Sequence, residues 1–229
     1  MHYTCGLSEQ ELLMHGVILR EALLRILVRY SQTGASSVEQ AEVCIRALRY
    51  ARLDIGLAPF SGSALPSSLA PTLAEALSDA PRPDRDFEIL LSTLEILLPS
   101  SRWTQRFATG NDEVEFEDRH RHALMFGKGG LFECSTMTLG LAVMAPELNY
   151  PFHRHPPAEF YLVLSEGDWY REDAGWWSPG AGGMVFNPRS AMHSMRSTRK
   201  PLLALWGLID PVPHIVTSGV SNNFNLTTP

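Results

Sequence analysis

The sequence predicts a mainly β protein, in which a small β-barrel follows an α-helical layer. Through the first hundred or so residues, apolar side chains recur at the three- and four-residue spacing of amphipathic helices. From Arg121 onward, short β-type segments alternate with turns rich in Gly, Pro, Asp and Ser. Because the change falls near Gly110, we predict a helical N-terminal region over residues 1–110 and a β-barrel over residues 111–229.

Four helices are expected in the N-terminal region. The first starts at a capping box, in which Ser8 and Glu11 satisfy each other's free backbone amides. The last is ended by Pro99, which cannot continue a helix. The expected segments are residues 8–30, 36–48, 71–77 and 86–98. The region contains no cluster of metal-type ligands, so we interpret it as a packing and dimerisation layer or a lid over a site elsewhere.

Five β segments are expected in the second half of the chain, at residues 122–126, 131–144, 159–164, 183–186 and 202–208. Short strands at such even spacing are typical of a β-sandwich or a small barrel. The acidic run within residues 111–118 is interpreted as a solvated linker or an exposed strand face.

Composition excludes several classes of protein. With 45% hydrophobic residues among 229, the chain can bury a substantial core, which excludes disorder as its main state. Its formal net charge is −6 and its Lys and Arg are scattered, so neither nucleic acid nor a membrane surface is an expected partner. The longest uncharged stretch, residues 55–74, contains three prolines and cannot span a membrane. No secretory signal is visible, so the expected compartment is the cytoplasm.

Three of the eight histidines fall in two short strings of the β-rich half. In YPFHRHPPAEFY, His153 and His155 are two residues apart, so a strand directs both imidazoles to one face. Glu159 follows four positions later, and His193, in GGMVFNPRSAMHS, is expected to arrive from a separate strand. Two or three imidazoles with one carboxylate suit a divalent transition metal with open positions, whether Fe, Mn, Zn, Ni or Co.

These strings resemble the paired signatures of the cupin superfamily, G-x5-H-x-H-x(3,4)-E-x6-G and G-x5-P-x-G-x2-H-x3-N. The resemblance implies a small cupin β-barrel, a double-stranded β-helix of jelly-roll type, with one metal inside it. The metal ligands that it implies are His153, His155, Glu159 and His193.

The chain departs from the cupin signatures at four turn positions. Glu147 stands where the first signature begins with glycine, and Gly167 comes one residue late at its end. In the second signature, Ser190 replaces a glycine and Ser197 replaces the final asparagine. All four implied ligands are nevertheless present.

Two longer strings narrow the resemblance. HRHPPAEFYLVLSEGDWYREDAGWW and NPRSAMHSMRS are similar to the cupin-type dimethylsulfoniopropionate (DMSP) lyases, the DddL and DddQ group. A helical N-terminal extension also fits the larger members of that group. The resemblance implies a carbon–sulfur lyase that cleaves DMSP to acrylate and dimethyl sulfide, with a small sulfonium carboxylate as its substrate.

Such an elimination needs a base, and two tyrosines are candidates. Tyr161 lies two residues after Glu159, so on a strand it points to the same face as that ligand. A phenol normally titrates near 10, but a neighbouring divalent cation favours the phenolate. In the resembling family, the tyrosine at this position is the base. Tyr150 matches a second tyrosine of the family, which could bind the carboxylate or share the proton transfer.

Two alternatives remain open from the sequence. Another metal-dependent cupin enzyme, such as a dioxygenase or a sugar isomerase, would use the same four ligands. A non-enzymatic small-molecule-binding cupin would usually carry a DNA-reading module, which the N-terminal helices do not resemble. Four of the five tryptophans fall in the β-rich half, and at least one is expected to line the pocket, since aromatic faces attract sulfonium cations.

Overall fold

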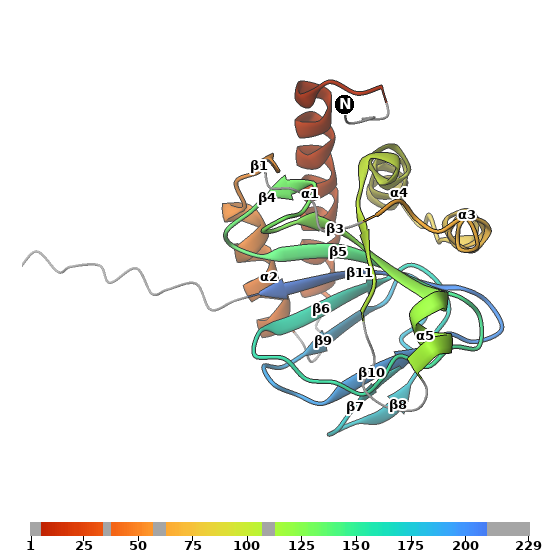
Figure 1. The fold of residues 1–229 in the computed structure, drawn as a ribbon. Helices are drawn as coiled ribbons and strands as arrows, with labels where there is room; N and C mark the ends of the chain where they lie inside the picture. Colours follow the sequence, from red (N-terminus) through yellow and green to blue (C-terminus); the bar gives the residue numbers. More distant parts are fainter. Residues whose placement is uncertain (1–5, 34–37, 57–62, 107–112, 210–229) are drawn as a thin grey trace, which may run out of the picture.

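The computed structural model describes residues 6–33, 38–56, 63–106 and 113–209. Two facing β-sheets form a barrel, and helices cover the outer face of the larger sheet (Figure 1). Within the described ranges, every helix is too short or too polar to serve as a membrane span.

Local sequence signals explain where the helices begin. At the start of α1, the Ser8 hydroxyl accepts a hydrogen bond from the backbone of Glu11, whose carboxylate accepts one from the Ser8 amide. At the start of α4, the Asp84 carboxylate caps two backbone amides. The predicted start of the second helix lies outside the described residues. The helices are α1 (Glu9–Ser31), α2 (Val38–Tyr50), α3 (Ala70–Asp79), α4 (Arg85–Leu97) and α5 (Glu113–Arg119), and a 3₁₀ turn, Leu98–Ser100, follows α4.

The larger sheet has the strand order β1-β4-β3-β5-β11-β6-β9, and β2 also pairs with β3. Its members are β1 (Asp54–Ile55), β2 (Trp103–Thr104), β3 (His120–Phe126), β4 (Phe132–Glu133), β5 (Thr138–Met144), β6 (Ala158–Val163), β9 (Met184–Asn187) and β11 (Leu202–Ile209). The smaller sheet has the order β10-β7-β8, with β7 (Asp168–Arg171), β8 (Gly175–Trp177) and β10 (His193–Arg196).

The larger sheet is buried on both faces, which explains the nearly continuous apolar run of β11. On β6, Phe160 and Leu162 pack with the helices, whereas Tyr161 and Val163 belong to a second core between the two sheets. The same alternation continues along β5 and β11. Glu159 shares the inner face of β6 with Tyr161, so the two-residue period of the strand places both side chains inside the barrel.

The structure corrects two of the predicted elements. The described part of the acidic run is helix α5, not a linker or a strand face, and it buries Phe116 against the barrel. The predicted strand 131–144 is divided into β4 and β5. The sequence also did not indicate β7 or β8 as strands, whereas β10 is the separate strand on which His193 was expected.

The boundary proposed near residue 110 stays a prediction. Two short strands from before it, β1 and β2, pair with β4 and β3 of the larger sheet. Side chains of the helices and of the sheet's outer face form one continuous core.

Candidate metal centre

The two histidine strings meet through the backbone. His153 and His193 exchange two main-chain hydrogen bonds, at 3.0 and 2.9 Å, so the segment before β6 runs alongside β10. This pairing brings the imidazoles of His153, His155 and His193 into one cluster, in which one nitrogen of each lies within 4.8 Å of the others. The structure thus brings together the three histidines that the sequence singled out.

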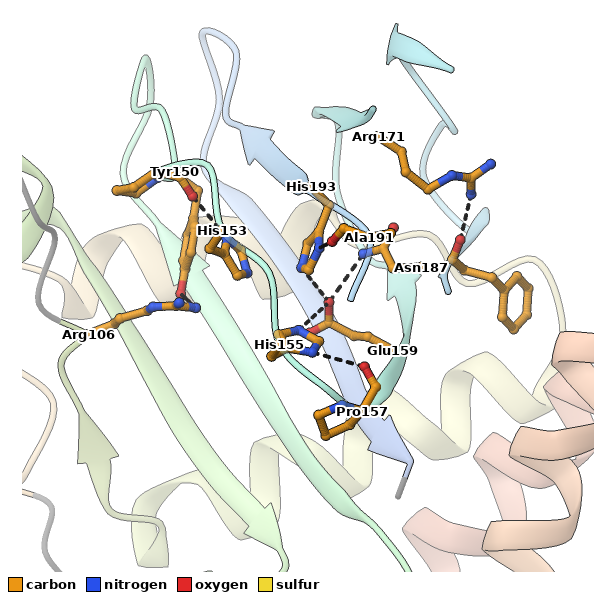
Figure 2. Close-up of polar contacts among 12 residues, drawn as sticks. Arg106, Tyr150, His153, His155, Pro157, Glu159, Arg171, Asn187, Ala191 and His193 are labelled. Carbon is orange, nitrogen blue, oxygen red and sulfur yellow. Dashed lines mark hydrogen bonds and ion pairs between the residues drawn. The ribbon is translucent and has the colours of Figure 1, made fainter. Parts of the chain in front are cut away.

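All three rings are held in the same tautomer. In each one, Nδ1 lies within hydrogen-bond distance of a backbone carbonyl, which can only accept, so Nδ1 carries the hydrogen and Nε2 of the neutral ring keeps a lone pair. The carbonyl for His153 is that of Pro151, at 2.9 Å. The carbonyls for His155 and His193 are those of Pro157, at 3.0 Å, and Ala191, at 2.8 Å (Figure 2). Backbone contacts of this kind orient metal-ligating imidazoles.

Glu159 reaches the cluster from β6. Its Oε2 lies 3.0 Å from Nε2 of His193 and 3.4 Å from Nε2 of His155, and the amide of Asn187 on β9 donates to the same oxygen at 3.2 Å. Burial opposes ionisation of Glu159, but positive charge shared with His155 and His193, whether protons on their Nε2 atoms or a bound cation, outweighs it and holds the pKa of its carboxyl well below its usual range. The side chain is therefore a buried carboxylate.

The cluster fits a metal ion. The Nε2 atoms of His155 and His193 are buried and have no hydrogen-bond partner among the described residues, although Glu159 is within ion-pair distance. Burial lowers the pKa of His153 to about 3, so this ring is neutral. Imidazole lone pairs that face a buried carboxylate without hydrogen bonds destabilise the fold, unless a cation bound between them attracts both the nitrogens and the carboxylate. Three imidazoles and one carboxylate are the donor set of a divalent transition metal.

Both candidate tyrosines are buried beside this cluster. Burial raises the pKa of Tyr161 well above its usual value, and the Glu159 charge raises it further. Burial also raises the pKa of Tyr150, to about 12, although Arg106 opposes that shift. The rings of Tyr150 and His153 are 5.0 Å apart.

A pocket of about 280 Å³ contains both tyrosines and most of the cluster. Trp206 lines it, whereas the other described tryptophans do not. Its lining consists of Thr104, Arg106, His122, Leu124, Tyr150, His153, His155, Glu159, Tyr161, Trp206 and Leu208. Another cavity, of about 340 Å³, lies beside α3 and α4; its lining is mainly Ala and Leu and has no imidazole.

A glycine on β5 makes room for the indole of Trp206. Gly140 is the cross-strand partner of Trp206 on β11. A Cβ atom at position 140 would lie 2.3 Å from Cζ2 of the indole, which is closer than atoms can approach. The ring therefore needs glycine at this position to lie where it does.

Sequence reasoning missed two polar residues of the pocket, His122 and Arg106. The His122 Nε2 and an Arg106 guanidinium nitrogen each lie 3.2 Å from the Tyr150 hydroxyl. His122 begins a predicted strand and forms a second H-x-H pair with His120, and that signal could have found His122. Arg106 stands in no motif.

Two of the four positions that depart from the cupin signatures keep the glycine-type backbone. Glu147 has φ 55° and Ser190 has φ 58°, both in the left-handed region that favours glycine. Ser197 takes over a structural contact: its hydroxyl accepts from the amide of Leu148 and donates to the carbonyl of Ala145. The backbone conformation of these turns is thus kept without the glycine or asparagine of the signatures.

Comparison with known proteins points to one family. The dimethylsulfoniopropionate lyase family profile matches residues 65–204. The DMSP lyase DddQ of Ruegeria pomeroyi is 29% identical over 106 residues, which are 46% of this chain and 53% of DddQ. The chain is thus aligned with about half the length of this curated relative.

Solved structures share the fold. The crystal structure of DddQ from Ruegeria pomeroyi superposes with a TM-score of 0.58 at 20% identity, covering 84% of this chain and 93% of that one. A structure described with the DMSP lyases RdDddP and RnDddQII gives 0.55 at 19% identity, covering 85% and 94%. The predicted fold class, a mainly β cupin-type barrel preceded by helices, is confirmed. Since the family profile spans well over half of the sequence and includes the histidine cluster, the chain belongs to the dimethylsulfoniopropionate lyase family.

Proposed function

We propose that the chain is a metal-dependent lyase that cleaves DMSP to acrylate and dimethyl sulfide. The observation that carries the proposal is the meeting of the histidine cluster, Glu159 and two buried tyrosines around one pocket, in a member of this family. A pocket of about 280 Å³ is large enough for a substrate of this size.

The residues proposed to hold the metal are His153, His155, Glu159 and His193. The unpartnered Nε2 atoms and the ionised Glu159 support this assignment. When bound, a divalent cation would polarise the substrate carboxylate as a Lewis acid and favour the phenolate of a neighbouring tyrosine.

Tyr161 is the proposed base. Its phenolate oxygen takes a proton from the carbon next to the substrate carboxylate. The C–H electron pair forms the new C=C bond as the bond to sulfur breaks, which releases neutral dimethyl sulfide and leaves acrylate. Tyr161 and Glu159 are two residues apart on β6 and point to the same inner face, so the proposed base lies beside a proposed ligand.

Tyr150 is proposed to orient the substrate carboxylate or to share the proton transfer. Its hydroxyl is already fixed by Arg106 and His122, which suits orientation better than removal of a proton. Trp206 is proposed as an aromatic wall for the sulfonium.

The test is to purify the protein, measure its metal content and assay the same sample for headspace dimethyl sulfide, acrylate and oxygen consumption. We expect equimolar dimethyl sulfide and acrylate without oxygen uptake, abolished by chelation and restored by a divalent metal. Oxygen consumption without dimethyl sulfide would instead indicate a dioxygenase. A metal-loaded protein that releases neither product from DMSP would contradict the proposed function.

A further inference from the structure

Arg106 is the one cationic residue that lines the pocket among the described residues. It follows β2, and the pairing of Thr104 with His122 on β3 brings it to the pocket from a distant part of the sequence. In Figure 2, its side chain extends toward the Tyr150 hydroxyl from the side away from Glu159 and His193.

Two contacts fix the position of Arg106. Its backbone amide donates to Nε2 of His120 at 3.4 Å, and Nδ1 of that ring donates to the Phe116 carbonyl at 2.8 Å. Burial lowers the pKa of His120 to about 4, so the ring is neutral and Nε2 can accept. The guanidinium donates to the Tyr150 hydroxyl at 3.2 Å and lies 5.5 Å from the centre of that ring.

The guanidinium retains capacity to bind an anion. Among the described residues, one of its five N–H groups donates to Tyr150, and no carboxylate forms an ion pair with it. Arg106 is exposed, so the remaining donors are accessible from the pocket mouth.

The substrate proposed above has two charged ends. Glu159 is the acidic residue of the lining, and a bound divalent cation would neutralise its negative charge. Arg106 and the Tyr150 hydroxyl form the remaining anion-binding pair, a planar fork of donors beside a phenol.

We propose that Arg106, with the Tyr150 hydroxyl, binds the carboxylate of the substrate and thereby orients it for elimination. The inference rests on the proposed function for the identity of that carboxylate. When one oxygen of the substrate carboxylate accepts hydrogen bonds from Arg106, the second oxygen is free to face the imidazole cluster. The carbon that loses its proton is bonded directly to this carboxylate, so fixing it also fixes the C–H bond that the base attacks.

Arg106→Gln and Arg106→Lys test this in metal-loaded protein, with three probes whose binding needs no turnover. Propionate has the carboxylate, propionamide is its neutral isostere, and trimethylsulfonium has only the cation. We expect Arg106→Gln to weaken propionate binding roughly 10- to 100-fold and to leave the other two probes almost unchanged. Arg106→Lys keeps the charge and is expected to restore part of the affinity. For DMSP, KM rises by a similar factor, and kcat falls as well because the C–H bond is no longer held in line with the base.

Arg154→Gln is the matched control, because it removes one positive charge near the cluster from an exposed side chain whose described partner is Glu172. Unchanged propionate affinity in Arg106→Gln would overturn the inference, and so would equal loss of all three probes, which indicates a structural role. Arg106-dependent propionate binding without dimethyl sulfide release would refute the proposed function alone. If the protein releases dimethyl sulfide but its propionate affinity does not depend on Arg106, this inference alone is refuted.

Discussion

At the scale of single residues, the pocket assigns different surroundings to its two tyrosines. Tyr161 stands next to Glu159 on β6, whereas the Tyr150 hydroxyl lies between Arg106 and an imidazole. Both phenols are buried, and burial alone keeps them protonated. The proposed metal therefore decides which of them can become a base.

Replacing each tyrosine by phenylalanine separates the two roles. We expect Tyr161→Phe to keep the bound metal and to lower kcat by roughly 10²- to 10⁴-fold, because ring packing remains while the ionisable oxygen is lost. Tyr150→Phe should act mainly on KM. The measurements are steady-state kinetics with metal analysis of each variant. If Tyr150→Phe is inactive and Tyr161→Phe turns over normally, the two roles are reversed; normal turnover in both contradicts a tyrosine base.

Ser190 offers a stability prediction. It has φ 58° in the turn before β10, its amide donates to the His155 carbonyl, and the next carbonyl, of Ala191, orients His193. A β-branched side chain is strained there, so Ser190→Val is expected to destabilise by about 1–2 kcal/mol. Ser190→Gly should cost nothing or stabilise by up to about 1 kcal/mol. Denaturant unfolding of both variants checks this; equal effects would show that the backbone is unstrained.

At the scale of elements, α1 and α4 are joined by charge as well as by packing. Asp86 at the start of α4 forms ion pairs with Arg25, at 2.6 Å, and with Arg29 of α1. Partial burial opposes its ionisation, but the two guanidinium groups outweigh it and lower the pKa of Asp86. A lowered folded-state pKa gives stability that is present above the unfolded-state value near 4 and lost as pH falls through the folded-state value.

Asp86→Asn is therefore expected to lower the free energy of unfolding by about 1 kcal/mol at pH 7, since both arginine side chains are nearly half exposed to solvent. The difference from the wild type should shrink as pH falls below about 4. Glu88→Gln, at an exposed position on the same helix, is the matched control. Urea unfolding at pH 7 and at pH 3 provides the comparison, and an equal difference at both pH values would exclude the ion pair as its cause.

The elements differ in how far the sequence predicts them. The capping box marks the start of α1 in the sequence because its contacts are local, within three residues. The acidic run is misassigned because seven residues contain too little periodicity to separate a helix from a strand face. The strands β7, β8 and β10 are only three or four residues long, and pairing rather than composition defines them.

The candidate site divides in the same way. Its histidines and Glu159 are predictable because they stand at fixed offsets in two short strings. Arg106 is not, because the pairing of β2 with β3 brings it there across a long sequence separation. Residues that reach a pocket through such pairing leave no periodic signal in the sequence.

At the scale of the whole molecule, the cluster joins the two sheets. Glu159 stands on β6 of the larger sheet, and His193 on β10 of the smaller one. The larger sheet is supported by helices, whereas the smaller sheet lacks that layer among the described residues. A cation bound by both sheets would therefore stabilise the smaller one most.

Removing the metal is expected to lower Tm by about 5–10 °C, which corresponds to roughly 2.7 kcal/mol of binding at a hundredfold excess over Kd. Hydrogen exchange should rise more in β7, β8 and β10 than in β5 and β11. His193→Ala supplies the control, since its Tm should no longer respond to chelation. Equal exchange in both sheets after chelation would contradict a bridging metal.

The packing of Trp206 against Gly140 means that the volume of the pocket depends on a residue outside its lining. Gly140 does not line the cavity, yet an added methyl group there would collide with the indole that does. The size of the pocket is thereby linked to a residue that is not part of its lining. A search for altered specificity in this chain would therefore begin behind the pocket, on β5, as well as on its surface.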